Sequence, residues 1–203
     1  MSRIVYSIFK RTLDIFGAIM GIALLSPVLL VVSILIKLES KGKVLFSQKR
    51  VGLNGKEFKI YKFRSMVENA EDLKKNLEDK NEMSGPMFKI KSDPRITRVG
   101  SFIRKTSIDE LPQLINVLKG DMSLVGPRPS LPKEVESFEP WMLKRLEVKP
   151  GLTCYWQVSG RNSIGFHEWM ELDIKYANEM SILVDIKLIF KTFLVLFGDK
   201  NAY

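Results

Sequence analysis

The chain has 203 residues, 45% of them apolar, and its 32 Lys and Arg against 23 Asp and Glu give a net charge of +9. This length suits one domain, or one domain with an appendage, and the charge favours a polyanionic partner: nucleic acid, an anionic membrane surface or a phosphorylated small molecule. A single cysteine (Cys154) and a single histidine (His167) exclude an internal disulfide, most Cys-His and Ser-His catalytic arrangements and most His/Cys metal cages. If the protein is an enzyme, carboxylates and cations must do most of the work.

The N-terminal region contains a segment of the membrane type. Residues 15–36 form a run of 22 residues without a charge, and about 20 apolar residues suffice for a helix to cross the hydrocarbon core. Lys10 and Arg11 precede the run, and no small-residue cleavage site follows it. A cleaved signal peptide would also have a shorter apolar region, so the sequence predicts a retained membrane segment.

The topology of this segment depends on the Ser26-Pro27 pair at its middle. Proline removes a backbone donor and clashes with the preceding turn, which forces a kink. Basic residues flank the run on both sides, so the positive-inside tendency places both ends in the cytoplasm. A helix that dips into one leaflet and returns satisfies both observations. One kinked spanning helix is the alternative, because proline is tolerated in true spans.

The region after residue 40 begins with a hairpin pattern. Residues 44–46 and 58–63 are rich in strand-forming residues, and Asn54-Gly55 between them is a favoured tight-turn pair. The second run alternates apolar residues with lysine, as a half-buried strand does. Residues 67–82 are nearly all charged or polar, which predicts a solvated helix or a mobile loop.

The remaining pattern is mostly helical. Residues 108–119 carry apolar residues at i, i+3, i+4 and i+7 counted from Leu111, and Gly120 ends this helix. Residues 181–197 are strongly apolar but include three charged residues, so they are predicted to form a core or interfacial helix and not a spanning one. The sequence further predicts helices at 133–146 and 166–177 and a short strand at 152–158.

The stretch TSIDELPQL, residues 106–114, places Asp109 and Glu110 side by side. Read locally, it is a well-formed helix start: Ser107 and Glu110 make a capping box, and Asp109 complements the helix dipole. This structural interpretation is favoured when the stretch is read alone.

Neighbouring cations support a functional interpretation of the same stretch. Arg104 precedes it, and Arg128 lies between Pro127 and Pro129, which stiffen the loop and reduce the entropy of ordering the arginine. These cations are expected to keep Asp109 ionised and to hold a phosphate against it. A carboxylate beside a bound phosphate can coordinate Mg²⁺ or attack phosphorus.

Several motifs together resemble one family, the monotopic phosphoglycosyl transferases of bacteria, also called bacterial sugar transferases or polyprenyl-phosphate hexose-1-phosphate transferases. The resemblance covers essentially the whole chain, and the order and spacing of the motifs make it specific. The motifs are Lys10-Arg11-x-x-Asp14, Ser26-Pro27, Gln48-x-Arg50-x-Gly52, Lys62-Phe63-Arg64-Ser65-Met66, Asp109-Glu110-Leu111-Pro112-Gln113, Gly126-Pro127-Arg128-Pro129, Lys149-Pro150-Gly151-Leu152-Thr153 and Ser159-Gly160-Arg161-Asn162.

The resemblance implies an enzyme that transfers a sugar 1-phosphate from a UDP-sugar to a polyprenyl phosphate such as undecaprenyl phosphate and releases UMP. This is the first membrane step of exopolysaccharide, capsule, O-antigen or glycoprotein assembly. By the same resemblance Asp109 is the nucleophile and a Mg²⁺ ligand, and Glu110 is a supporting carboxylate. The cations placed at the substrate are Arg64, Arg104, Arg128 and Arg161.

The resemblance also implies an α+β, mostly helical fold and a location on the cytoplasmic face of the bacterial inner membrane. Residues 1–40 are expected to form a re-entrant membrane helix broken at Ser26 and Pro27. Residues 41–203 are expected to form the catalytic domain, with a small hairpin and amphipathic interfacial helices. The expected partners are the donor, the lipid acceptor and membrane lipids, with no nucleic acid and a possible homo-oligomer. The chain reads as a short form of the family, and a membrane-anchored, non-catalytic anion or lipid-headgroup binding module is the alternative function.

Overall fold

The computed structural model describes residues 3–80, 90, 93–160 and 164–198. The helices and strands, in chain order, are α1 (Arg3–Glu39), β1 (Leu45–Val51), β2 (Glu57–Phe63), α2 (Ala70–Lys74), α3 (Arg98–Lys105), α4 (Leu114–Lys119), β3 (Ser123–Val125), α5 (Pro132–Glu136), β4 (Gly151–Thr153), α6 (Tyr155–Val158), α7 (Phe166–Glu179) and α8 (Ile182–Gly198). Short 3₁₀ helices lie between them: η1 (Leu53–Gly55), η2 (Lys75–Lys80), η3 (Ile108–Gln113) and η4 (Pro140–Glu147). The predicted α+β, mostly helical class is confirmed.

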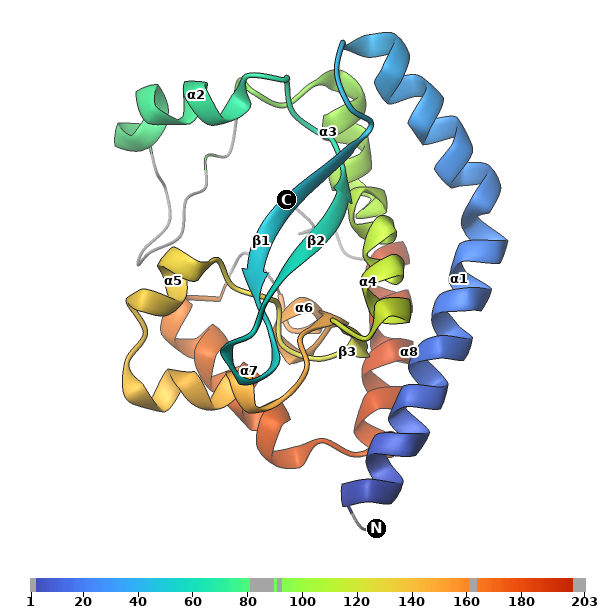
Figure 1. The fold of residues 1–203 in the computed structure, drawn as a ribbon, viewed down its shortest axis with the longest axis vertical. Helices are drawn as coiled ribbons and strands as arrows, with labels where there is room; N and C mark the ends of the chain where they lie inside the picture. The colour runs from blue at the N-terminus through green and yellow to red at the C-terminus, as the bar shows by residue number, and fades with distance from the viewer. Residues whose placement is uncertain (1–2, 81–89, 91–92, 161–163, 199–203) are drawn as a thin grey trace.

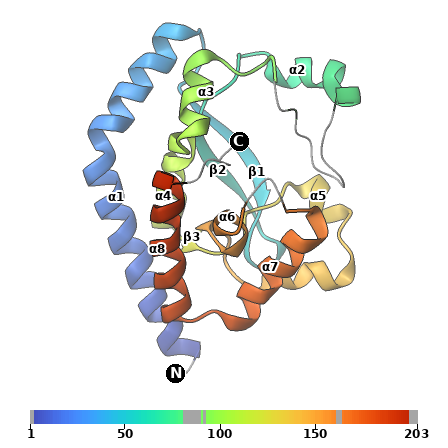
Figure 2. The same cartoon turned by 180° about the vertical axis from the view of Figure 1, so that it is seen from behind.

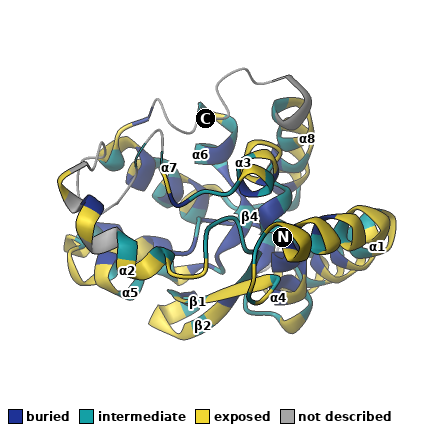
Figure 3. Ribbon diagram, turned by 90° about the horizontal axis from the view of Figure 1, so that it is seen from above, coloured by how far each residue is buried: buried dark blue, intermediate teal, exposed yellow. Residues whose placement is uncertain are grey.

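Helix α1 runs along one side of the molecule, and only one of its faces is covered (Figure 1). On the covered face Ala18 packs against Leu114 and Val117 of α4, and Val32 and Ile36 pack against Phe63 and Ile103. The opposite face exposes many large apolar side chains, and most of the helix is coloured as exposed in Figure 3. Within the described residues α1 is the helix long and apolar enough to cross a membrane, by length and composition. The uncovered face is a weak sign that α1 associates with a membrane.

The Ser26-Pro27 pair does not interrupt this helix. The α-helix continues from Arg3 to Glu39 with Pro27 inside it, and Figure 1 shows it bowed. Proline cannot donate to the carbonyl four residues earlier, which is that of Ala23. The Ser26 hydroxyl donates to this carbonyl instead, at 2.8 Å. The predicted break is therefore a bend, because the serine satisfies the carbonyl that the proline leaves without its helical donor.

The first half of α1 is fastened to the rest of the protein by its basic motif. Lys10 bonds Asp185 of α8 at 2.8 Å, and Arg11 donates to the carbonyls of Val117 and Leu118 at the end of α4. Figure 2 shows α8 lying alongside this part of α1. Lys10 also donates to Tyr176 of α7, and Asp14 accepts from Ser123 of β3, so the polar residues of the motif bind four other elements.

The second half of α1 is fastened at its C-terminal end. Arg64 donates to the carbonyls of Ser40 and Lys41 at 2.9 and 2.5 Å, and Glu39 accepts from the first amides of α3, those of Arg98 and Val99. Both ends of the apolar helix therefore contact the same body of the protein. The predicted boundary between residues 1–40 and 41–203 stays a prediction.

Two small sheets place the functional loops. Strands β1 and β2 pair antiparallel from Leu45↔Phe63 to Val51↔Glu57, around a turn in which Asn54 adopts a left-handed conformation (φ 53°). This confirms the predicted hairpin, although its first strand is longer than expected. Strands β3 and β4 pair in parallel. The strand predicted at 152–158 is wrong beyond Thr153, because residues 155–158 form α6.

The later helices are partly as predicted. Helix α7 confirms the prediction for 166–177, and α8 confirms a helix at 181–197. Residues 133–146 are split between α5 and η4. Residues 67–82 include α2 and η2, and their last two residues lie outside the described residues.

Candidate active site

The Asp109-Glu110 pair lies on the 3₁₀ helix η3, between α3 and α4. The predicted capping box is wrong: Ser107 is left-handed (φ 56°) and its side chain makes no cap bond. The serine to glutamate spacing fits a capping box in an α-helix, but here the first turn is 3₁₀ and α-helical geometry begins only at Leu114. The Glu110 side chain, instead of reaching back to the backbone, extends towards β2 and the Arg128 loop.

Glu110 is held by two cations. Lys62 Nζ of β2 lies 2.6 Å from Glu110 Oε1, and Arg128 Nη1 lies 3.0 Å from the same oxygen. Burial alone would raise the pKa of Glu110, but the charges and hydrogen bonds of Lys62 and Arg128 outweigh it and hold that pKa well below its usual range. Glu110 is therefore a permanent anion that fixes both cations.

Asp109 is in a different state although it is the next residue. Asp109 is 9% exposed, and its carboxylate accepts no hydrogen bond from a described residue. Burial, with the charge of Glu110 second, raises the pKa of Asp109 to about 6, against the smaller opposing effects of Lys62, Arg104 and Arg128. The sequence suggested that the cations near the site hold the pKa of Asp109 low. In the structure Lys62 and Arg128 pair with Glu110 instead, and the pKa of Asp109 is raised. Asp109 is still mostly ionised at pH 7, by roughly ten to one.

Lys62 is the cation that sequence reasoning missed. It stands in the motif Lys62-Phe63-Arg64-Ser65-Met66, from which only Arg64 was selected as a substrate residue. The alternation of lysine along β2 indicated one solvent face, yet Lys62 is only 16% exposed and faces Glu110. The alternation of apolar residues and lysine along β2 does not show that Lys62 lies close to the acidic pair in space.

The loop that carries Arg128 is held through its carbonyl groups. Because Pro127 and Pro129 have no N–H, the loop cannot form regular structure, and donors from several elements bind its oxygens. These are Lys10 Nζ and Tyr176 Oη on Val125 O (3.0 and 3.1 Å), Gly151 N on Pro127 O (2.9 Å), Arg145 Nη2 on Arg128 O (2.6 Å), Arg50 Nη1 on Pro129 O (3.1 Å) and Val51 N on Ser130 O (2.9 Å). The predicted stiff loop is therefore present, and tertiary contacts stiffen it as well as its prolines.

Two glycines let this loop meet the segment after η4. Gly126 and Gly151 lie against each other, and a Cβ atom on either one would overlap the backbone of the other segment. Gly126 N also donates to Thr153 O at 2.8 Å. The motifs 126–129 and 149–153 are thus one packed unit under the carboxylates.

The other predicted substrate arginines are placed differently from one another. Arg104 is exposed in the last turn of α3, and its charge contributes to the pKa of Asp109. Arg64 lies apart from the pair, because it binds the carbonyls at the end of α1. Arg161 lies outside the described residues. Of these predictions, the structure brings Asp109, Glu110 and Arg128 together.

A pocket opens beside the pair. Its lining consists of Arg50, Ile60, Lys62, Glu110, Gln113, Arg128, Pro129, Gly151 and Leu152. Burial, and next the charge of Arg128, lowers the pKa of Arg50 to about 10, so this arginine stays charged at neutral pH. The cavity is small, about 10 Å³, so it has room for about one oxygen atom and not for a whole ligand. Its three cations, Arg50, Lys62 and Arg128, suit a phosphate oxygen at this place.

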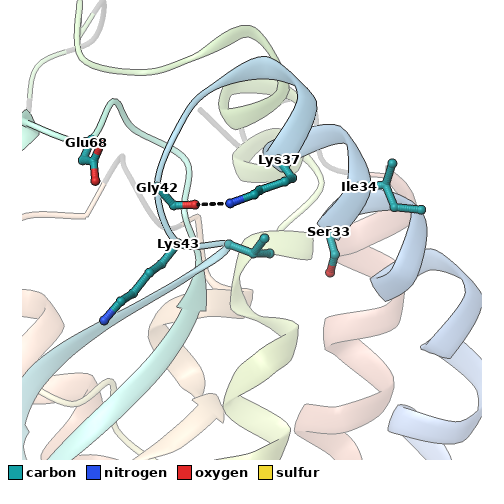
Figure 4. Close-up of a pocket in the computed structure, with 7 residues that line it drawn as sticks. Ser33, Ile34, Lys37, Gly42, Lys43 and Glu68 are labelled. Carbon is teal, nitrogen blue, oxygen red and sulfur yellow. Dashed lines mark hydrogen bonds between the residues drawn. The ribbon is translucent and has the colours of Figure 1, made fainter.

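A second, shallower pocket lies at the far end of α1 and has no acidic pair. Figure 4 shows its lining, in which Lys37 donates to the carbonyl of Gly42 at 3.3 Å and Lys43 extends away from Lys37. Glu68 is the acidic residue of this lining. Its lysines do not converge, so it offers no equivalent to the centre around Glu110.

The donor set can be tested against Mg²⁺. Among the described residues there is no cluster of three or more His, Cys, Asp or Glu side chains that could hold a metal. Mg²⁺ in phosphate-transfer sites is commonly held by one or two carboxylates together with substrate phosphates. Asp109, whose oxygens have no described hydrogen-bond donor, fits that role, whereas Glu110 is already paired with Lys62 and Arg128.

Comparison with known proteins identifies the family. The family model for bacterial sugar transferases matches residues 5–199. The chain belongs to the bacterial sugar transferase family.

Relatives in this family differ in length. The chain is 53% identical over 196 residues to the galactosyl transferase CpsE of Streptococcus agalactiae, covering 96% of this chain and 43% of CpsE. It is 43% identical over 198 residues to the undecaprenyl-phosphate galactose phosphotransferase of Salmonella typhimurium, covering 96% of this chain and 41% of that protein. It is 38% identical over 200 residues to the exopolysaccharide production protein ExoY of Sinorhizobium fredii, covering 97% of this chain and 88% of ExoY. The chain thus spans about two fifths of the first two sugar transferases and most of ExoY.

Proposed function

We propose that this sugar transferase moves a sugar 1-phosphate from a UDP-sugar to polyprenyl phosphate, in the first membrane step of a bacterial polysaccharide or glycoconjugate. The names of relatives support the class of reaction, because one is an undecaprenyl-phosphate galactose phosphotransferase and another is a UDP-galactose-lipid carrier transferase. We further propose that the transfer passes through a covalent intermediate on Asp109.

The observation that carries this proposal is the contrast between two adjacent carboxylates. Glu110 is paired with Lys62 and Arg128 through Oε1, whereas Asp109 accepts no hydrogen bond from a described residue and is nonetheless mostly ionised at pH 7. A carboxylate nucleophile needs a free oxygen, and a desolvated anion is more reactive than one bound by donors. Asp109 meets both conditions.

In the first step a carboxylate oxygen of Asp109 attacks the phosphorus that bears the sugar. The bond from this phosphorus to the bridging oxygen breaks, and UMP leaves with the electron pair. Arg128 and Lys62, fixed by Glu110, stand where they can stabilise the charge on the phosphoryl oxygens. The product is an aspartyl phosphosugar.

In the second step a phosphate oxygen of the lipid attacks the same phosphorus, and the bond to Asp109 breaks. The aspartate is restored and polyprenyl-diphospho-sugar forms. Because a covalent intermediate divides the transfer, the water-soluble donor can leave before the lipid acceptor arrives. When bound, Mg²⁺ would neutralise charge on the donor phosphates, with Asp109 and these phosphates as its ligands.

We place the enzyme on the cytoplasmic face of the bacterial inner membrane, with α1 as a re-entrant helix. Both ends of α1 are bonded to the same domain, through Lys10 at one end and Glu39 and Arg64 at the other. A helix that crossed the bilayer would have its ends on opposite sides, away from one shared domain. The exposed apolar stripe of α8, which includes Leu183, Phe190 and Leu194, extends the apolar surface next to α1.

Release of UMP tests the proposal. Detergent-solubilised protein is incubated with Mg²⁺, undecaprenyl phosphate and each of a panel of UDP-sugars, and UMP is measured. We expect release with at least one donor and a fall of at least a thousandfold in Asp109→Asn. Equal release by wild type and Asp109→Asn would overturn the covalent mechanism, and no release with any donor would favour a binding module. Donor without acceptor should label Asp109 with the phosphosugar, as detected by mass spectrometry.

Labelling of engineered cysteines tests the topology. Cysteines are placed singly at residues 7 and 40, on either side of the apolar run, in a Cys154→Ala background. Labelling of both sites from the cytoplasmic side supports a re-entrant helix. Labelling from opposite sides would overturn it.

A further inference from the structure

A buried ion pair supports the Arg128 loop from outside the cluster of Asp109, Glu110, Lys62 and Arg128. Arg145 of η4 and Asp173 of α7 are 1% and 0% exposed, and Arg145 Nη2 lies 2.6 Å from Asp173 Oδ2. Arg145 Nε donates to the same oxygen at 3.0 Å. The guanidinium is also close to the rings of Phe138 and Trp169, with its carbon 5.6 and 5.7 Å from their centroids.

Arg145 uses its remaining donors on the loop. Nη2 donates to the carbonyl oxygen of Arg128 at 2.6 Å, and Nη1 donates to the hydroxyl of Ser130. One planar group therefore joins α7 to two residues of the loop. The Arg128 carbonyl is fixed from below by Arg145, while the Arg128 side chain reaches the other way, to Glu110.

Stability does not explain such a pair well. Removing two charges from water costs several kcal/mol per ion, and apolar residues of the same volume are often as stable or more stable. What a guanidinium adds over an apolar side chain is direction, because its fixed fork sets the angles to several acceptors together. Here the acceptors are Asp173, the Arg128 carbonyl and Ser130.

We propose that Arg145, oriented by Asp173, is a positioning residue that sets the backbone of Arg128 and thereby places its guanidinium against the transferring phosphate. This inference rests on the proposed function. Arg145 touches neither Glu110 nor Asp109 among the described contacts and acts only through Arg128. A displacement of about 1 Å at a catalytic group can lower a rate about a hundredfold.

The first experiment replaces Arg145 by lysine, which keeps the charge but loses the fork. We expect kcat/KM for UMP release to fall about 10- to 100-fold. Asp173→Asn removes the group that orients Arg145 and keeps its shape, so it should lower kcat/KM in the same direction. If Arg145→Lys does not fold, Asp173→Asn and Ser130→Ala carry the same experiment, because each removes one partner of the guanidinium.

A matched control is available in the same chain. Arg95 and Asp93 form another buried pair at 2.6 Å, 6% and 5% exposed. Arg95 also donates to the Ala70 carbonyl and accepts from the Val67 amide. Asp93→Asn breaks a pair of similar burial away from the Arg128 loop. It should lower the melting temperature and leave kcat/KM within about twofold of wild type.

A double-mutant cycle separates positioning from general support. In an Arg128→Ala background, Arg145→Lys should change kcat/KM by less than about twofold, because the group it positions is gone. It should still lower the melting temperature there.

Three results would overturn the inference: wild-type kcat/KM in Arg145→Lys or Asp173→Asn, an undiminished loss in the Arg128→Ala background, or an equal loss in Asp93→Asn. Absence of UMP release from the wild type would overturn the proposed function instead, and the inference with it.

Discussion

Two polar clusters of this molecule flank the Arg128 loop and differ in how completely their acceptors are used. At the base of α1, Asp185 accepts from Lys10, Tyr6 and Tyr176 at 2.8, 3.0 and 2.7 Å. At the candidate active site Glu110 accepts from Lys62 and Arg128, both on Oε1, but Asp109 accepts nothing from the described residues.

This difference separates a cluster that stabilises the fold, around Asp185, from the cluster that we propose carries the reaction, around Asp109. A buried charge without donors is costly, so a chain keeps one only where some other advantage outweighs that cost. The cluster at Asp185 has no such imbalance and joins α1, α7 and α8. In the site cluster the carboxylate without donors is Asp109, which is the group that the proposed mechanism bonds to the substrate phosphorus.

The largest effect is expected from breaking the complete cluster. Asp185→Ala leaves the Lys10 ammonium without its carboxylate and should lower the free energy of unfolding by about 3–5 kcal/mol. Thermal melting in detergent measures it. The control is Glu57→Ala, which removes the exposed Lys49–Glu57 pair and should cost less than about 1 kcal/mol. Similar losses in the two variants would contradict the comparison.

At the Asp109 site we expect a substitution to raise the free energy of unfolding instead of lowering it. Asp109→Asn removes a desolvated charge next to Glu110, so it should abolish UMP release while raising the free energy of unfolding by on the order of 1–3 kcal/mol at pH 7. Glu110→Gln, the control, should be less stable than wild type because Lys62 and Arg128 lose their anion. A lower melting temperature in Asp109→Asn than in wild type would contradict the prediction.

The pH dependence follows from the raised pKa of Asp109. In the free enzyme kcat/KM should fall about tenfold per pH unit below about pH 6, as Asp109, the proposed nucleophile, takes up a proton. Stability should move the other way: because the folded pKa lies above that of the unfolded chain, the folded state is stabilised as the pH falls from about 6 towards 4. Burial also raises the pKa of Asp173 to about 6, so the acid limb must persist in Asp173→Asn to be assigned to Asp109.

The smallest effect is expected in helix α1. Ser26→Ala removes the donor that replaces the missing proline N–H at the Ala23 carbonyl and should cost about 1 kcal/mol. Ser33→Ala is the matched control, since Ser33 Oγ donates to the Leu29 carbonyl, which the helix backbone can satisfy as well. Equal melting temperatures for the two variants would contradict this role of Ser26.

The sequence predicts those features whose cause is local. The hairpin follows from Asn54-Gly55 and the end of α4 from Gly120, which is left-handed at φ 87°. The grouping of Asp109, Glu110 and Arg128 follows from the motifs and their order. The capping box was wrong because the same spacing fits a 3₁₀ turn, and spacing alone does not choose between the two geometries.

The features that the sequence did not predict arise from contacts between distant segments. Lys62 meets Glu110 across 48 residues, and Arg145 meets Asp173 across 28. Arg64 stands two residues after Lys62 in the same motif, but it follows the end of β2 at Phe63, where the strand alternation no longer applies, and its side chain binds the carbonyls at the end of α1. Only the packing of β2 against η3 shows that Lys62, and not Arg64, lies against the acidic pair.

The contact between Gly126 and Gly151 has a consequence for building chimaeras. Because neither residue has room for a side chain, the segments 126–129 and 149–153 fit only as a matched couple. A sugar transferase that receives the arginine loop of a relative should therefore receive the second segment from the same donor. If only one segment is exchanged, two backbones from different proteins must pack directly against each other, with no side chain between them that could adjust. The smallest exchangeable module here therefore consists of both segments.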